Sequence, residues 1–69
     1  MELVLDPALA NKVDSLPEDG MGFHVVDFIL HDGRVIREVV VLTGSVAIVP
    51  EGARWLSTAD IADLRSSHP

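Results

Sequence analysis

Two long apolar stretches, residues 23–30 and 34–42, flank an Asp32-Gly33 dipeptide. Both stretches are rich in Val, Ile, Leu and Phe, a composition typical of β-strands, and Asp-Gly is a common turn of β-hairpins. A further apolar stretch at residues 46–49 follows a second turn and is ended by a proline. The pattern therefore predicts a three-stranded antiparallel meander.

The segment before these strands predicts a short helix. Asp6 can accept hydrogen bonds from free backbone N–H groups at a helix start, and Pro7 is tolerated in a first turn because its missing N–H is not needed there. The apolar residues that follow share one helical stripe: Leu9, Val13 and Leu16. Pro17 then ends the helix, since the residue before a proline is pushed out of the helical conformation.

The C-terminal segment predicts a second short helix. Ser57-Thr58-Ala59-Asp60 has the hydroxyl-to-acid spacing of a capping box, and Ile61 and Leu64 follow at helical spacing. The expected fold is thus α+β in one small domain covering residues 1–69: an N-terminal helix, the three-stranded antiparallel meander and a short C-terminal helix. A small SH3-like β-barrel is the alternative.

The charged residues of the two long strands indicate how the hairpin pairs. A two-residue turn would place Asp27 opposite Glu38, and like charges in that position repel. A three-residue loop over residues 31–33 places Asp27 opposite Arg37, and it requires Gly33 in the left-handed conformation that glycine adopts freely. We therefore predict the three-residue loop.

This register gives the hairpin two apolar faces. One face carries Phe23, Val25, Ile29, Val35, Val39 and Val41, and the other carries Val26, Phe28, Leu30, Ile36, Val40 and Leu42. Two short helices cover one face of a three-stranded sheet. The second face needs either closure of the sheet into a barrel or a second copy of the chain.

Composition narrows the classes of function. The 69 residues include no cysteine, so neither disulfides nor thiolate metal sites stabilise this small domain. The net charge of −6 argues against binding to nucleic acid or to an anionic membrane. Apolar runs such as Val39 to Leu42 are far too short to cross a bilayer, and no signal peptide is visible, which predicts a cytoplasmic location.

Residues able to carry chemistry do not converge. His24 and His31 are an odd number of positions apart on one strand, which directs them to opposite faces, and His68 lies in the tail. Asp27 and Glu38 would form a carboxylate pair only in the disfavoured register. We expect no catalytic residue, no metal site and no cofactor.

Two features suggest contact with another protein. Acids outnumber the one lysine among the first twenty residues: Glu2, Asp6, Asp14, Glu18 and Asp19 against Lys12. They form either a solvated surface or an acidic patch that docks a basic partner. Arg54 and Trp55 belong to the residue types most enriched at binding hot spots, although a lone tryptophan is often a core residue.

The stretches GMGFHVVDFILHDGRVIREVVVLTG (residues 20–44) and STADIADLR (residues 57–65) resemble small bacterial proteins of unknown function. The shared features are a glycine-led strand, a DGR hairpin, a second valine-rich strand and a terminal D-I-x-D-type segment. The resemblance implies a bacterial protein and no particular activity.

The sequence thus predicts a non-enzymatic protein–protein interaction module that pairs with itself as a homodimer. The alternative is an acidic inhibitor, antitoxin or immunity-type protein that blocks a basic partner. The predicted interface consists of Val26, Phe28, Ile36, Val40 and Leu42, with Arg54 and Trp55 at its margin. Nucleic acid and membrane are not expected as partners.

Overall fold

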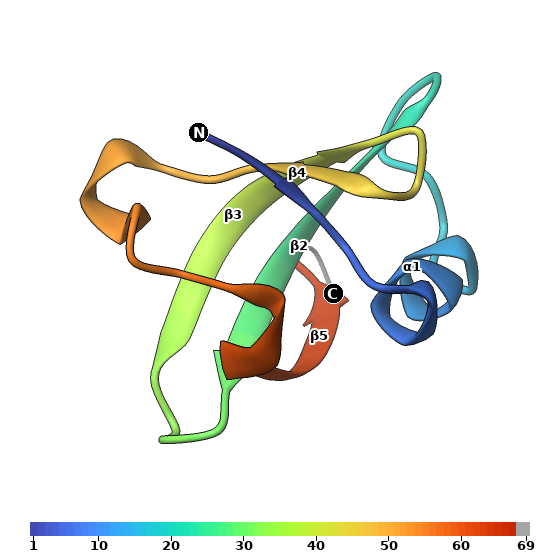
Figure 1. The fold of residues 1–69 in the computed structure, drawn as a ribbon. Helices are drawn as coiled ribbons and strands as arrows, with labels where there is room; N and C mark the ends of the chain where they lie inside the picture. Colours follow the sequence, from blue (N-terminus) through green and yellow to red (C-terminus); the bar gives the residue numbers. More distant parts are fainter. Residues whose placement is uncertain (68–69) are drawn as a thin grey trace.

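The computed structural model describes residues 1–67, which form one α-helix and a five-stranded antiparallel sheet (Figure 1). The elements are β1 (Glu2–Val4), α1 (Pro7–Asp14), β2 (Phe23–Leu30), β3 (Val35–Leu42), β4 (Val46–Ile48) and β5 (Ile61–Ser66). Two 3-10 turns, Glu51–Ala53 and Thr58–Asp60, connect β4 to β5. The strand order across the sheet is β1-β4-β3-β2-β5. The predicted α+β class is confirmed, whereas the predicted count of three strands and two helices is wrong.

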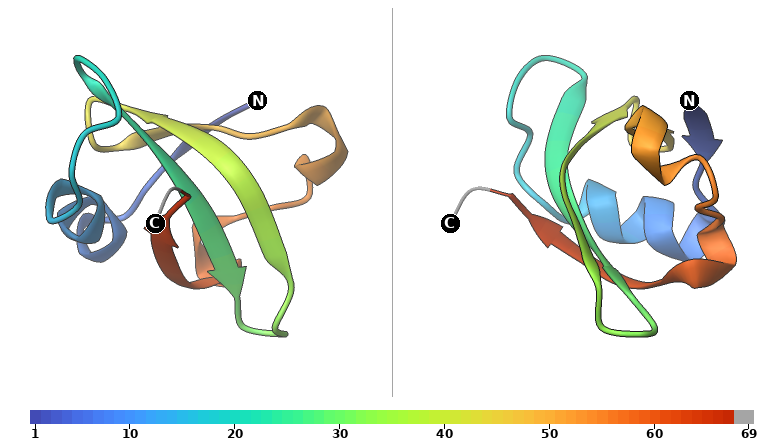
Figure 2. Two further views of the ribbon diagram at one scale, coloured as in Figure 1. Left: turned by 180° about the vertical axis from the view of Figure 1, so that it is seen from behind. Right: turned by 90° about the vertical axis from the view of Figure 1, so that its left-hand side faces the viewer.

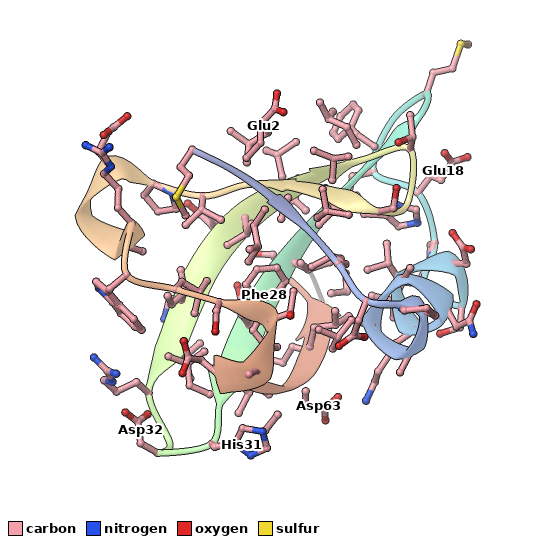
Figure 3. The ribbon with its side chains drawn as sticks, viewed as in Figure 1. Glu2, Glu18, Phe28, His31, Asp32 and Asp63 are labelled. Atoms are coloured by element: carbon pink, nitrogen blue, oxygen red, sulfur yellow. The ribbon has the colours of Figure 1, made fainter. Side chains whose placement is uncertain are left out.

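The sheet curls around the core, and α1 lies on its concave side (Figure 2). Phe28 is fully buried at the centre of this core, where Figure 3 shows it between the sheet and the segments that cover it. The buried apolar residues are Leu5, Leu9, Val13, Val26, Phe28, Leu30, Val39, Val41, Ala47, Val49, Ala53, Leu56, Ile61 and Leu64. Every strand except β1 contributes to this set, and partly buried Leu3 of β1 packs against it.

Helix α1 begins where the sequence predicts. A side-chain oxygen of Asp6 accepts a hydrogen bond from the backbone N–H of Leu9 at 2.9 Å, and Pro7 occupies the first turn. Leu9 and Val13 are buried beneath the helix, and Leu16 packs against the core from the turn that follows. Capping and the apolar stripe together account for this helix.

The tip of the β2–β3 hairpin also has the predicted form. Leu30 and Arg34 close the loop, with the N–H of Leu30 donating to the carbonyl of Arg34 at 2.8 Å. Gly33 has a φ of 92°, which is the left-handed region that favours glycine. The pairs Phe28–Ile36 and Ile29–Val35 follow from this three-residue loop.

The register of the hairpin changes at Asp27, on the side away from the hairpin tip. A β-bulge adds one residue to β3, so Val26 pairs with Val39 instead of with Glu38. Glu38 has a φ of 57°, and its backbone N–H donates to a carboxylate oxygen of Asp27 at 3.0 Å. The extra residue reverses the faces of the second half of β3. Our assignment of Val40 and Leu42 to the face of Val26 and Phe28 is therefore wrong: Val39 and Val41 share that face and are fully buried.

The predicted C-terminal helix is wrong as well, because this segment forms a 3-10 turn followed by β5. The capping box exists, with the backbone N–H and the hydroxyl of Ser57 both donating to Asp60, but it stabilises only the turn. Ile61 pairs with Leu30 and Leu64 pairs with Phe28, across a second irregularity in the ladder. One extra residue in a strand brings side chains three positions apart to the same face, which imitates helical spacing.

Strand β1 was not predicted. It adds to the sheet beyond β4, with Glu2 opposite Ile48 and Val4 opposite Val46. In residues 1–67 no ladder joins β1 to β5, so the sheet does not close into the SH3-like barrel that was the alternative expectation.

Replacing Gly33 with alanine should lower the free energy of unfolding by about 1–2 kcal/mol, because an L-residue is strained at this φ. Urea denaturation measures the change. Gly52→Ala is the matched control, since Gly52 also has open space around it but no left-handed φ. A Gly33→Ala protein as stable as the Gly52→Ala protein would contradict the three-residue loop.

The left-handed conformation of Glu38 leads to a second prediction. Glu38→Gly should change the free energy of unfolding by less than about 1 kcal/mol, because relief of strain offsets the added freedom of the unfolded chain. Glu38→Val should cost about 1–2 kcal/mol, since β-branched residues avoid this conformation. Equal stabilities of the two variants in urea denaturation would show that no left-handed residue is required here.

Candidate interaction surface

The bulge separates two regions on the outer, convex side of the sheet. Figure 1 shows β3 curving past β2 until its second half runs beside β4. On the far side of the bulge, β1, β4 and the ends of β3 and β2 form a layer four strands wide. We call the apolar side chains on its outside the outer apolar surface: Val4, Phe23, Val25, Val40, Leu42, Val46 and Ile48.

These side chains lie in two rows across the strands. Phe23, Leu42, Val46 and Val4 form one row, and Val25, Val40, Ile48 and Glu2 form the other. Three of the apolar residues are open to solvent: Val4 is 69% exposed, Leu42 40% and Ile48 38%. Figure 3 shows Glu2 pointing away from the protein at the edge of this surface. The other four apolar residues of the two rows, Phe23, Val25, Val40 and Val46, are partly buried.

The residues that lead into β2 support one side of this surface. The ring of Phe23 lies where a side chain at Gly20 would be, so a larger residue there would displace the ring. Asp19 accepts a hydrogen bond from the N–H of Val25 at 2.7 Å, and Glu18 accepts one from the N–H of Gly22 at 3.1 Å. The loop therefore holds Phe23 and Val25 in place.

This local role bears on the predicted acidic patch. Of the five acids among the first twenty residues, Asp6, Glu18 and Asp19 each accept a hydrogen bond from a nearby backbone N–H. Acidic residues at helix starts and in turns commonly accept such hydrogen bonds. The contacts favour local structure over a docking patch as the reason for these acids.

A charged cluster borders the outer apolar surface at the bulge. Asp27 is 4% exposed, and its Oδ2 lies 3.3 Å from Nε of Arg65 and 4.0 Å from a terminal guanidinium nitrogen of Arg37. Burial raises the pKa of Asp27, but the N–H of Glu38, the side chain of Ser67 and Arg65 outweigh burial and lower the pKa below its ordinary value of 3.8. Two arginines thus share one buried carboxylate.

The predicted interface residues do not lie together. Val26 and Phe28 are fully buried, and Ile36 packs against the core. Val40 and Leu42 lie on the outer apolar surface. The bulge, which the sequence analysis missed, divides these five residues between two faces.

Arg54 and Trp55 lie apart from that surface. The guanidinium of Arg54 is 3.8 Å from the carboxylate of Glu51. Trp55 is 50% exposed, and the guanidinium of Arg34 sits 4.5 Å from its ring centroid, a cation–π contact. Arg34 pairs with Leu30, whose side chain is in the core, so this contact lies on the concave side of the sheet. Trp55 is therefore neither a core residue nor part of the outer apolar surface.

A shallow cavity of about 170 Å³ lies beside the hairpin tip, lined by Leu30, His31, Asp32, Arg34, Ala59 and Asp60. Small-molecule sites usually measure 300–1,000 Å³. Asp32 already binds Arg34 at 2.6 Å, and Asp60 accepts the N–H of Ser57 at 2.9 Å. The backbone of Arg34 and its guanidinium also lower the pKa of Asp32. We assign no ligand to this cavity.

The histidines are separated in the structure. His24 is buried, with Nε2 3.1 Å from the carbonyl of Leu16 and Nδ1 without a hydrogen-bond partner, whereas His31 is exposed at the hairpin tip. His68 lies outside the described residues. Residues 1–67 contain no group of three or more His, Asp or Glu side chains that could hold a metal ion.

These features define a small α+β domain whose most distinctive surface is apolar and formed by a sheet. Comparison with protein-family models, curated proteins and solved structures finds no match to the chain. No helix of the described chain is long and apolar enough to cross a membrane.

Asp27→Asn should reduce the free energy of unfolding by about 1–3 kcal/mol at pH 7, because asparagine keeps an acceptor for the N–H of Glu38 but loses the charge that faces two arginines. Since folding lowers the pKa of Asp27, its carboxylate stabilises the fold fully at a pH well above 3.8 and loses this effect as the pH falls below that value.

The measurement is urea denaturation of both proteins between pH 7 and pH 2.5. The difference in the free energy of unfolding between wild type and Asp27→Asn should therefore shrink as the pH falls toward 2.5. A difference that is constant over this range would contradict the charged role of Asp27.

Proposed function

We propose that this protein is a non-enzymatic, cytoplasmic protein–protein interaction module that forms a homodimer through the outer apolar surface. One observation carries the proposal: seven apolar side chains form two rows on a four-stranded layer, and three of them, Val4, Leu42 and Ile48, remain exposed in the described chain. Fully burying an exposed aliphatic side chain contributes about 1.5–3 kcal/mol, and covering the exposed part of each of these side chains contributes a fraction of that, so the surface favours association.

The size of the molecule fits this proposal. Its Cα trace measures 29 × 22 × 21 Å, so one side projects to roughly 600 Å². A standard protein interface buries about 800 Å² on each partner, counted over the contours of the side chains. One whole side of the molecule, of which the outer apolar surface is a part, is therefore close to what a dimer needs, and identical chains most often meet about a two-fold axis.

The absence of cysteine makes an association partner more important for a chain of 69 residues. Small domains bury a smaller fraction of their surface than large ones and commonly depend on disulfides, metals or partner chains. An apolar contact between two copies supplies that stabilisation here. The net charge of −6 opposes association, and the two arginines at the edge of the outer apolar surface reduce this repulsion locally.

Replacing Leu42 and Ile48 with lysine in one protein should weaken dimerisation on the order of 100-fold, because two apolar contacts are lost and charges enter the interface. Sedimentation equilibrium from micromolar to millimolar protein measures the dissociation constant. Leu42 is 40% and Ile48 38% exposed in the single chain, and thermal melting checks that the variant folds. Met21→Lys is the control, since Met21 is 100% exposed in the loop before β2.

Salt distinguishes the acidic inhibitor from an apolar dimer. Dimerisation through the outer apolar surface should not be lost as salt rises, because salt weakens both its ion pairs and the repulsion between two chains of charge −6, whereas an acidic inhibitor releases a basic partner. A wild-type protein that stays monomeric at every concentration would contradict the proposal.

A further inference from the structure

We propose that the two copies pair about a two-fold axis that runs parallel to the strands, midway between β3 and β4, and that Glu2 of each copy binds the arginine pair at the bulge of the other. This arrangement rests on the proposed homodimer and specifies how its surfaces meet. Three observations carry it: the width of the layer, the sizes of its end residues and the placement of its charges.

The layer has four strands, and its centre lies between β4 and β3. A two-fold axis along this central line covers all four strands with their directions aligned, as in stacked sheets. An axis across the strands would align them too, but it would place Glu2 over Val4 of the partner, away from the arginines. It lays β3 over β4 of the partner, and β2 over β1 of the partner. The facing pairs are then Leu42 with Val46, Val40 with Ile48, Phe23 with Val4 and Val25 with Glu2.

The sizes of the end residues suit this pairing. Phe23 is the largest side chain of the outer apolar surface and stands at its β2 end, while Val4 stands at its β1 end and is 69% exposed. The two-fold axis places the partner's Phe23 against Val4. A large side chain meets a small and open one at both ends of the interface.

The charged residues give the most specific support for this pairing of the two copies. Glu2 is the one acid in the two rows of the layer, and it stands at the β1 end. The two-fold axis brings it over Val25 of the partner, and Asp27 is the next residue of β2 on that side, about 7 Å further along the strand. Arg37 and Arg65 both point their guanidinium groups at Asp27. Glu2 of the partner is thus within side-chain reach of two arginines that share one carboxylate.

Charge reversal tests the pairing. Glu2→Arg and Arg37→Glu should each weaken homodimerisation about tenfold, since each turns both symmetric ion pairs into like-charge contacts. An equimolar mixture of the two variants should form a heterodimer about as tight as the wild-type dimer, because both contacts then join opposite charges. Sedimentation equilibrium of each protein and of the mixture measures this, with thermal melting to confirm that each variant folds.

Two control variants carry the same charge changes away from the surface. Glu51→Arg matches Glu2→Arg, and Arg54→Glu matches Arg37→Glu, with side-chain exposures of 72% for Arg54 and 71% for Arg37. Both controls should keep dissociation constants within about threefold of wild type, because these residues are not in the interface.

The outcomes separate the two proposals. A wild-type protein that is monomeric throughout overturns the homodimer and this pairing with it. A wild-type dimer that responds to Glu2→Arg and Arg37→Glu no more than to the controls overturns the pairing alone. The pairing is also overturned if the mixture of Glu2→Arg and Arg37→Glu has a dissociation constant no lower than that of either variant alone.

Discussion

The hydrogen bond from the N–H of Glu38 to the buried carboxylate of Asp27 is the contact on which the rest of this structure depends. It stabilises a left-handed residue in the middle of β3 and thereby admits one extra residue into that strand. An extra residue reverses which side chains of the following strand face the core. Val39 and Val41 consequently enter the core, and Val40 and Leu42 are left on the outside. A buried carboxylate needs compensating partners, and Arg37 and Arg65 provide them.

The same bulge places the outer apolar surface on the outside of the sheet. The bulge bends the sheet, so residues 35–37 of β3 pair with β2 alone, while residues 40–42 pair with β2 on one side and with β4 on the other. The concave side is filled by α1 and the connecting turns. On the convex side of the four-stranded layer Val4, Leu42 and Ile48 remain exposed, and the apolar rows end at the arginine cluster. The site and the fold therefore share one cause.

Local signals in the sequence predicted the parts of the fold that local chemistry decides. Asp6 and Pro7 define the start of α1, and Gly33 defines the hairpin loop. The bulge could not be predicted from a pattern of valines that is apolar on both faces, because either register buries a similar set of side chains. Asp27 opposite Arg37 and Asp27 opposite Glu38 were weighed as alternatives, whereas Asp27 in fact faces both residues across the bulge.

The remaining errors have related causes. Ile61 and Leu64 are three positions apart, which is also a helical spacing. A second irregularity adds a residue to β5 and so places both side chains on one face of the strand. β1 has three residues and is held by pairing with β4, a distant contact that composition does not reveal. The interface prediction included Val26 and Phe28 because it depended on the face assignment. The prediction that an apolar face of the sheet needs a partner does not depend on this face assignment.

The most direct test of the bulge is the strand register on its far side, read by NMR from cross-strand contacts between backbone protons. The structure predicts contacts between Val26 and Val39 as well as between Phe28 and Ile36, together with the strong NOE between the amide proton and Hα of Glu38 that a positive φ gives. Contacts between Val26 and Glu38, with an extended Glu38, would show one unbroken register. That result would return Val40 and Leu42 to the core side and contradict the account.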